Sequence, residues 1–152
     1  MLTDLPPRLL RVEYRGQNHP QRAGQRDSES GPTNLSDGAN CQRFAYAVVR
    51  HFGFRIGNFR SSELWDDTRY TRRVRNLKPL DILFFNSNRK AYGAHLAVYL
   101  GRSHAIHLSK EVAVPAVWRL EQFAQHSRYR VLVGAKRPRL RAPKAVPTRD
   151  MS

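Results

Sequence analysis

Apolar residues are concentrated between residues 41 and 133, and their spacing changes along that stretch. In "NCQRFAYAVVRHFG", residues 40–53, large apolar side chains recur every four positions and a glycine follows them. This period predicts a helix that stops at Gly53. Asn40 is a favourable residue to cap the start of this helix, which places Cys41 in its first turn.

The later part of this stretch alternates turn signals with short apolar runs. A serine followed by acidic residues predicts a short helix with a basic second half over 60–76. The run "ILFF", residues 82–85, is too short for a helix and too apolar for a surface strand, so it predicts a buried strand after a turn at Pro79. Asp81 is expected to anchor the start of that strand through a hydrogen bond. Further strands are predicted over 94–101, 104–109 and 129–137, with a short helix or turn over 117–125.

Helices that precede a run of strands predict an α+β fold, in which the helices pack on one side of a small antiparallel sheet. Residues 15–40 are rich in Gly, Ser, Asn, Gln and Pro, which predicts a long loop. We expect one domain over 34–137, preceded by an N-terminal segment and loop over 1–33. Residues 138–152 are basic and lack an apolar period, which predicts a disordered tail.

The 27 basic and 12 acidic residues give a formal charge of +15. Two basic clusters contribute to it, "RYTRRVR" at 69–75 and "AKRPRLRAPK" at 135–144. Such a surface attracts polyanions, and nucleic acid, anionic envelope polymers and anionic lipid all qualify as partners. One function that the sequence permits is therefore a domain without enzymatic activity that binds such a polymer through its basic surface.

A single cysteine excludes an intramolecular disulfide, and a free thiol suits a reducing compartment. The N-terminal residues contain no apolar run of signal-peptide length, and no segment is long enough to span a membrane. We therefore expect a cytoplasmic protein, or one exported by a route that needs no cleavable signal.

Cys41 is either a small buried hydrophobe or a nucleophile. A thiol reacts as the thiolate, and only a small fraction of a free thiol is ionised at neutral pH. The unpaired N–H groups and the dipole of a helix favour an anion near its first turn, so we expect the helix to lower the pKa of Cys41. A nucleophilic cysteine also needs a base, which can lie far away in the sequence.

His95 and His107 become neighbours if the strands around Gly101 form a hairpin. Antiparallel pairing joins residues whose numbers have a constant sum, and a sum of 202 centres the loop on Gly101. His95 would then lie opposite His107, with Cβ atoms about 4.5 to 5.5 Å apart on one face. A two-residue loop would make the sum odd and place the two imidazoles on opposite faces.

With the sum of 202, three side chains form a nucleophilic site. Cys41 attacks a carbonyl, His95 removes the thiol proton and later protonates the leaving amine, and His107 orients His95. A backbone N–H at the start of the helix would hold the oxyanion. The result is acyl transfer to water, and transfer to another acceptor would use the same residues.

The order of "NCQRFAYAVVRHFGF", "LKPLDILFF", "HLAVYLG" and "AIHLS" resembles the NlpC-type cell-wall cysteine peptidases of the papain-like superfamily. The resemblance covers residues 34–135. It implies a papain-like fold, with Cys41 as nucleophile, His95 as base and His107 as orienting residue. It also implies no cofactor, and a peptide or amide substrate such as a peptidoglycan stem peptide or a muropeptide.

Departures from the family pattern bear on the substrate. Members that cut stem peptides usually have Asp before the cysteine and Ser-Gly after it, where this chain has Asn40, Gln42 and Arg43. The Asp and Ser help to hold the free amine of the substrate, so the resemblance leaves the substrate open. Leu80 stands where the family has glycine, a change that the approach to a strand is expected to tolerate. The family's tyrosine a dozen residues ahead of the cysteine is absent, and Tyr14 would replace it if the long loop folds back.

Asn40, Gln42 and Trp65 are the residues predicted to bind substrate, although a large aromatic such as Trp65 or Trp118 also suits a core. Zinc is the alternative chemistry, because thiolate and imidazole are its usual ligands. The candidate ligands would be Cys41, His95, His104 and His107. The last two, three apart in a strand, should point to opposite faces, and paired cysteines are absent, so we expect no metal site.

Overall fold

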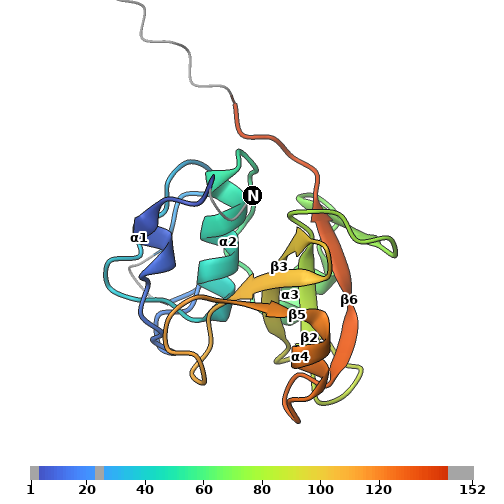
Figure 1. Cartoon of the computed structure of the whole chain (residues 1–152). Coiled ribbons are helices and arrows are strands. Elements are labelled where there is room, and N and C mark those ends of the chain that lie inside the picture. Colours follow the sequence, from blue (N-terminus) through green and yellow to red (C-terminus); the bar gives the residue numbers. More distant parts are fainter. Residues whose placement is uncertain (1–3, 23–25, 144–152) are drawn as a thin grey trace, which may run out of the picture.

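The computed structural model describes residues 4–22 and 26–143, and within them one six-stranded antiparallel sheet organises the chain (Figure 1). The elements in chain order are α1 (Pro7–Leu10), α2 (Cys41–His51), α3 (Ser61–Asp66), β1 (Thr71–Val74), β2 (Ile82–Asn86), β3 (His95–Gly101), β4 (His104–His107), β5 (Ala116–Arg119), α4 (Leu120–Ala124) and β6 (Val131–Pro138). The strands lie side by side in the order β1-β6-β2-β3-β4-β5. This is the α+β fold that the sequence predicts. Within the described residues, no helix is long and apolar enough to cross a membrane.

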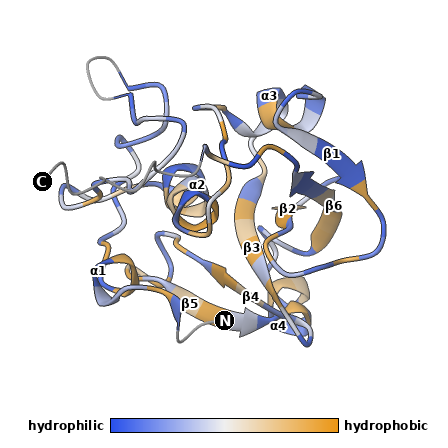
Figure 2. Ribbon diagram, turned by 90° about the horizontal axis from the view of Figure 1, so that it is seen from above, coloured by the Kyte–Doolittle hydropathy of each residue, from blue (hydrophilic) through white to orange (hydrophobic). Residues whose placement is uncertain are grey.

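The central strand β2 is apolar throughout because both of its faces are covered. Successive side chains of a strand point to opposite faces, so Ile82 and Phe84 enter one hydrophobic cluster, which includes residues of α1 and α2. Leu83 and Phe85 enter a second cluster, which includes Phe123 of α4. Figure 1 shows α1 and α2 together beside the sheet and α4 close to β5, and Figure 2 shows hydrophobic segments on both α2 and β4. Helices therefore cover both faces of the sheet, and the prediction that they pack on one side is wrong for α4.

Helix α2 forms where its four-residue period predicts it. The side chain of Asn40 accepts the backbone N–H of Arg43 at 2.9 Å, which caps the first turn. The helix ends at His51, and Gly53 follows with a φ of 94°, a conformation that favours glycine. Cys41 is thus the first residue of a well-capped helix.

The second half of the predicted helix over 60–76 is a strand instead. Helix α3 ends at Asp66, and the next carboxylate, that of Asp67, accepts the backbone N–H groups of Tyr70 and Thr71 at 3.0 and 2.9 Å. These bonds turn the chain into β1, which pairs with β6. The first basic cluster of the sequence contains β1, and the second begins on the neighbouring strand β6.

The β3–β4 hairpin turns through two residues, Arg102 and Ser103, and not through a loop centred on Gly101. Both residues have positive φ, 51° and 60°, as tight hairpin turns with a matching twist require. Gly101 pairs with His104, so the sum of the partner numbers is odd at the turn. Continued unchanged, that register would separate the two site histidines onto opposite faces.

An irregularity after Tyr99 brings the two histidines back to one face. The register shifts there by one residue, and Val98 pairs with Ile106 at an even sum of 204. His95 and His107 therefore share a face as diagonal neighbours and not as directly opposite partners. The shared face is confirmed, and the predicted register is wrong by two residues.

The N-terminal segment packs into the core of the domain. Helix α1, which the sequence analysis missed, contributes Leu9 to the hydrophobic cluster that also holds Val12 and the buried side of α2. An isolated bridge between Tyr14 and Ala39 brings the two ends of the predicted loop together. Among the described residues of 15–40 there is no helix and no strand of the sheet, as predicted.

The domain also extends further toward the C-terminus than predicted. Strand β6 runs through Pro138, and Arg141 forms an isolated bridge with Phe54. The expected start of a disordered tail at Pro138 is therefore too early. The rest of that prediction, over 144–152, lies outside the described residues.

Asp81 anchors the start of β2, as predicted. It is fully buried, accepts the backbone N–H of Lys78 at 2.8 Å and pairs with Arg137 at 2.8 Å. Leu80, just before it, has a φ of 78°, in the left-handed region where glycine is favoured. The leucine at this position therefore costs backbone strain, contrary to the expectation that it is tolerated.

Replacing Asp81 with asparagine is expected to lower the free energy of unfolding by about 2 to 3 kcal/mol, because Arg137 loses the charge of its partner at a site with little access to water. Urea denaturation at pH 7 measures this loss. Asp66→Asn is the matched control. Asp66 pairs with Arg73 at 3.5 Å on the exposed surface, where an ion pair contributes less than about 1 kcal/mol. Equal losses in the two variants would contradict the anchoring role of Asp81.

Candidate active site

Cys41 and His95 line the same open cavity, which has a volume of about 380 Å³. We call it the Cys41 cavity. Cys41 comes from the start of α2 and His95 from the first position of β3. Tyr14 also lines the cavity, so the N-terminal segment does fold back to the site as the sequence analysis required. The topology thus brings together residues that lie more than fifty positions apart.

Cys41 as a residue is half-buried and belongs to the lining of this open cavity. Burial raises the pKa of this thiol above its ordinary value, and this effect outweighs the lowering by the backbone amides of Leu96 and Gln42 and by the positive charge of Arg60. The expectation that the helix start lowers the pKa of Cys41 is therefore wrong in its net direction. At rest the thiol is therefore neutral, and it could act as a nucleophile only with a base to take its proton.

His95 and His107 form a hydrogen-bonded pair. The Nε2 atom of His95 lies 2.8 Å from Nδ1 of His107, and the two rings are nearly perpendicular, at 81°. Burial lowers the pKa of His95 well below its ordinary value, and the neighbouring His107 lowers it further. Burial likewise lowers the pKa of His107, to about 4. Both imidazoles are therefore neutral at pH 7, as a general base must be before it accepts a proton.

Aromatic rings fix the orientation of the two imidazoles. Tyr129 stacks on His95 with ring centres 4.4 Å apart. His107 is fully buried and contacts Trp118 and Phe123, with ring centres at 4.3 and 4.7 Å. Among the described residues, the Nε2 atom of His107 has no hydrogen-bond partner. Trp118 thus belongs to the support of His107 and does not line the Cys41 cavity.

Glu111 is a cavity residue that the sequence analysis missed. Its carboxylate accepts hydrogen bonds from Tyr129 Oη at 2.6 Å and from Arg128 Nη1 at 2.7 Å. Burial opposes the ionisation of Glu111, but these hydrogen bonds hold its pKa at about 2. Nothing in the local sequence marks this residue, because its place depends on the fold of the segment between β4 and β5. The cavity lining also carries Arg60 and Lys110, so cationic side chains outnumber the carboxylate.

The structure places the three residues predicted to bind substrate in different surroundings. Gln42 lines the Cys41 cavity, and its Nε2 donates to Ser61 Oγ at 2.8 Å. Asn40 is buried and caps α2, and its Nδ2 donates to Gln42 Oε1 at 3.3 Å. It does not line the cavity and contacts it through Gln42. Trp65 does not line this cavity at all. It packs against Phe84 and lines a separate groove, so the structure does not bring it together with Cys41.

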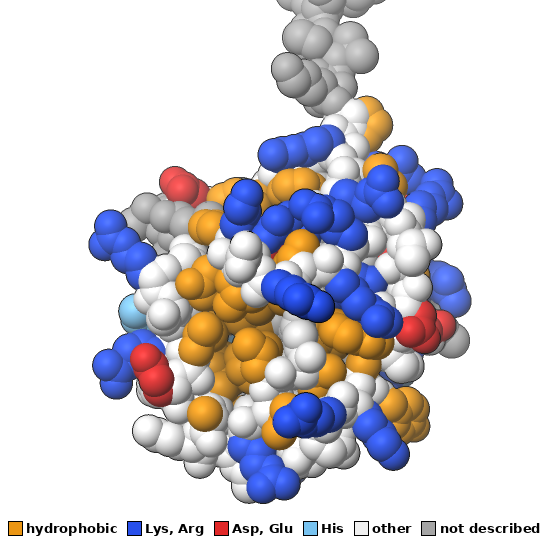
Figure 3. Space-filling view, turned by 90° about the vertical axis from the view of Figure 1, so that its right-hand side faces the viewer, with side chains coloured by type: hydrophobic (Ala, Val, Ile, Leu, Met, Phe, Trp, Pro, Cys, Tyr) orange, Lys and Arg blue, Asp and Glu red, His pale blue; other side chains and the backbone are white. Residues whose placement is uncertain are grey.

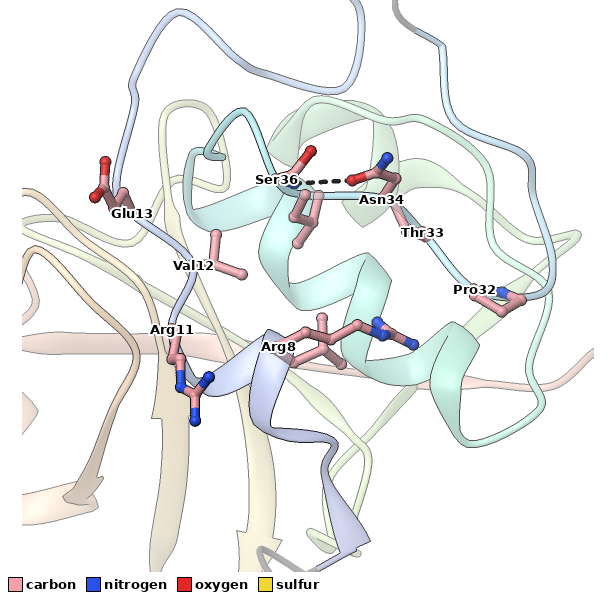
Figure 4. Close-up of a pocket in the computed structure, with 10 residues that line it drawn as sticks. Arg8, Arg11, Val12, Glu13, Pro32, Thr33, Asn34 and Ser36 are labelled. Atoms are coloured by element: carbon pink, nitrogen blue, oxygen red, sulfur yellow. Dashed lines mark hydrogen bonds between the residues drawn. The ribbon is translucent and has the colours of Figure 1, made fainter.

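Other features of the described residues do not combine into a second catalytic site. A groove of about 550 Å³ lies between α1 and residues 32–36, and its lining contains no cysteine or histidine (Figure 4). Of the candidate zinc ligands, His104 directs its Nδ1 toward the carbonyl of Arg102, 2.7 Å away in the hairpin turn. Within the described ranges, no three His, Cys, Asp or Glu side chains group in a way that could hold a metal ion.

Comparison with known proteins supports the architecture. No family model matches the chain, and no curated protein matches it. A crystal structure of an NlpC/P60 family protein from Bacillus cereus matches 68% of the chain at a TM-score of 0.50 and 19% sequence identity. The chain shares its fold with an NlpC/P60 protein. The match spans 32% of that protein's own chain, and at this identity the likeness extends to the fold alone.

Proposed function

We propose that this protein is a thiol-dependent hydrolase of the NlpC/P60 type, which cleaves an amide or peptide bond through Cys41, His95 and His107. The observation that carries the proposal is the joint placement of Cys41 and His95 in one cavity, with His95 hydrogen-bonded to His107 behind it. The three residue types and their connections are those of a nucleophile, a base and an orienting group.

The reaction begins with attack by the sulfur of Cys41 on the carbonyl carbon of the substrate. Because the thiol is neutral at rest, His95 takes the proton as the S–C bond forms. The protonated imidazole then gives this proton to the amine as the C–N bond breaks, which leaves a thioester on Cys41. Water attacks the thioester while His95 takes a proton from it. His95 then returns this proton to the sulfur as the C–S bond breaks, which releases a carboxylic acid and restores the free thiol and the neutral imidazole. Transfer to a different nucleophile would follow the same path.

The shared proton of the histidine pair has to lie on one particular nitrogen. Only one proton fits between Nε2 of His95 and Nδ1 of His107. If His95 carries it, Nδ1 of His95 keeps a free lone pair for the thiol proton. His107 then carries its own proton on Nε2, a buried atom that has no hydrogen-bond partner among the described residues. The base role of His95 requires this arrangement of the two protons.

The start of α2 supplies donors for the oxyanion. The first backbone N–H groups of a helix have no partner inside it, and Asn40 satisfies only the N–H of Arg43. The amides of Cys41 and Gln42 both act on the sulfur of Cys41, where they lower its pKa. Donors that face the sulfur are well placed to receive the oxygen that becomes charged when sulfur attacks.

The charges around the cavity favour a substrate that bears carboxylates. Arg60 and Lys110 line the cavity and have no ion-pair partner among the described residues, whereas Glu111 is already paired with Arg128. A peptide with acidic groups near the scissile bond would gain attraction from both free cations. Peptidoglycan stem peptides carry such groups, so muropeptides are the first substrates to test.

Incubation of the protein with purified muropeptides, followed by mass spectrometry, tests the proposal. We expect cleavage products with the mass of one added water, and none from Cys41→Ala under the same conditions. Hydroxylamine in the mixture should convert part of the acyl product to the hydroxamate, because it competes with water for the thioester. Equal cleavage by Cys41→Ala would contradict the proposal.

A further inference from the structure

The sheet has a step at its β1 edge. Strand β1 pairs only with Ala135–Pro138 of β6, so residues 131–134 of β6 have a neighbouring strand, β2, on one side only. Residues 75 and 76, which follow β1, bend away instead of continuing the pairing. An exposed groove of about 580 Å³ lies at this step. We call it the β6 groove.

The β6 groove is apolar in its middle. Val74, Leu77, Leu132 and Val133 line it, and Leu132 is 42% exposed, which is unusual for a leucine in a strand. Figure 3, which views the side of the molecule along which β6 runs, shows hydrophobic surface bordered by Lys and Arg side chains. Exposed apolar surface with a polar border is typical of an interaction site.

Trp65 forms a fixed wall of the groove. A Cβ atom on Gly134 would come within 2.5 Å of the Trp65 ring, so the indole rests directly on the backbone of β6. The guanidinium of Arg73 lies over the same ring, 4.2 Å from its centre, and Phe84 packs against it from the core. The face of the indole is therefore already covered on the side of Arg73.

The charge around the groove is positive. Arg73 and Arg75 are both exposed and belong to its lining, which contains no acidic residue among those that the structure describes. Arg73 already pairs with Asp66 at 3.5 Å on the exposed surface, so Arg75 supplies the uncompensated charge of the lining. On the paired part of the edge, Arg72 lies opposite Arg137, and Arg73 lies opposite Lys136. The whole chain carries a formal charge of +15, so a second copy would be repelled. Residues 144–152 are also net positive, which makes the chain's own C-terminal end a poor occupant.

We propose that the β6 groove binds an acidic, extended segment of a partner protein, which adds a strand to the open edge of β6. The free edge of residues 131–134 supplies backbone hydrogen-bonding groups, as in other complexes in which a peptide extends a sheet. Leu132 pairs with Phe85 and Gly134 with Phe84, so Leu132 and the Trp65 wall lie on opposite faces of the sheet. One set of alternate side chains of the bound segment would lie against Leu132, on the face that also carries Val74. The acidic side chains between them would project from the other face, toward Arg73 beside Trp65.

A peptide fits this groove better than a nucleic acid does. Single-stranded nucleic acids bind by stacking their bases on exposed aromatic faces, but Arg73 covers the face of Trp65. Aliphatic side chains and an unpaired strand edge offer a nucleobase no aromatic surface on which to stack. The same features are what an extended peptide needs from its receptor.

Titration with a labelled eight-residue peptide of alternating Glu and Val, followed by fluorescence anisotropy at 150 mM salt, tests the proposal. We expect saturable binding, and no binding of the same peptide with Lys in place of Glu. Methylation of alternate backbone nitrogens should remove the binding, because it blocks pairing with the strand edge. Arg75→Glu and Leu132→Ser should each weaken the affinity at least tenfold.

Arg11→Glu is the matched control for charge, because Arg11 is exposed and does not line this groove, and it should change the affinity less than twofold. Three results would each overturn the proposal: no binding of the acidic peptide up to 1 mM, equal binding of its methylated form, or tighter binding of oligo-dT that Arg75→Glu abolishes. The measurement does not involve Cys41, so its outcome is independent of the proposed hydrolase activity.

Discussion

His95→Ala is expected to lower kcat/KM for the cleaved peptide at least about a thousandfold at pH 7. Burial raises the pKa of Cys41, so almost no thiolate is present before the substrate binds. The reaction therefore depends on a base that removes the thiol proton during attack, and His95 is the imidazole that lines the cavity with Cys41. The alkylation of Cys41 by iodoacetamide should slow in parallel, and its rate against pH gives a measurement that needs no substrate.

Two further variants separate the role of His95 from a loss of structure. His95→Gln keeps most of the buried volume but supplies no base, so it should be as inactive as His95→Ala. His107→Phe keeps a ring between Trp118 and Phe123 but removes the partner of His95 Nε2. We expect it to retain about one to ten per cent of the activity, since an orienting partner contributes less than the base itself. Wild-type alkylation and cleavage rates in His95→Gln would exclude His95 as the base.

The pairing of the two histidines shows what the sequence determines and what it does not. The prediction that His95 and His107 share a face depends on an odd-length loop centred on Gly101. The structure does put them on one face, but through a two-residue turn and a register shift. The register depends on the turn, and Arg102 and Ser103 adopt positive φ although neither is Gly, Asn or Asp. A prediction from turn chemistry therefore misses both the two-residue turn and the register shift that compensates for it.

The elements that the sequence analysis missed are those held by tertiary contacts. Strand β1 has no apolar period, because two of its four residues are exposed arginines, and its start is fixed by the carboxylate of Asp67. Helix α1 is a single turn held by the burial of Leu9. Glu111 reaches the cavity because Tyr129 and Arg128, next to β6, hold its carboxylate. Such contacts join distant segments and leave no local pattern.

The buried histidine pair should make the fold sensitive to acid between pH 6.5 and about 4. Both folded-state pKa values lie below 6.5, and that of His107 is about 4. The unfolded chain therefore binds more protons as the pH falls through this window, so stability present above pH 6.5 is lost. Each histidine contributes a slope of about 1.4 kcal/mol per pH unit, and His107 alone accounts for about 3 kcal/mol by pH 4. Urea denaturation at half-unit steps of pH measures the slope.

The double variant His95→Gln/His107→Phe should flatten this slope, because neither replacement titrates. Phe123→Leu is the matched control: it loosens the packing around His107 and lowers stability at every pH, but it keeps both titrating groups and therefore the slope. Glu111 has a folded pKa of about 2, so the stability it contributes is lost only as the pH falls from about 4.5 toward 2. If the double variant kept the wild-type slope above pH 4.5, the acid sensitivity would arise from titrating groups other than His95 and His107. A flattened slope would mean that the buried pair, whose low pKa values keep the proposed base neutral at pH 7, also lowers the stability of the fold in acid.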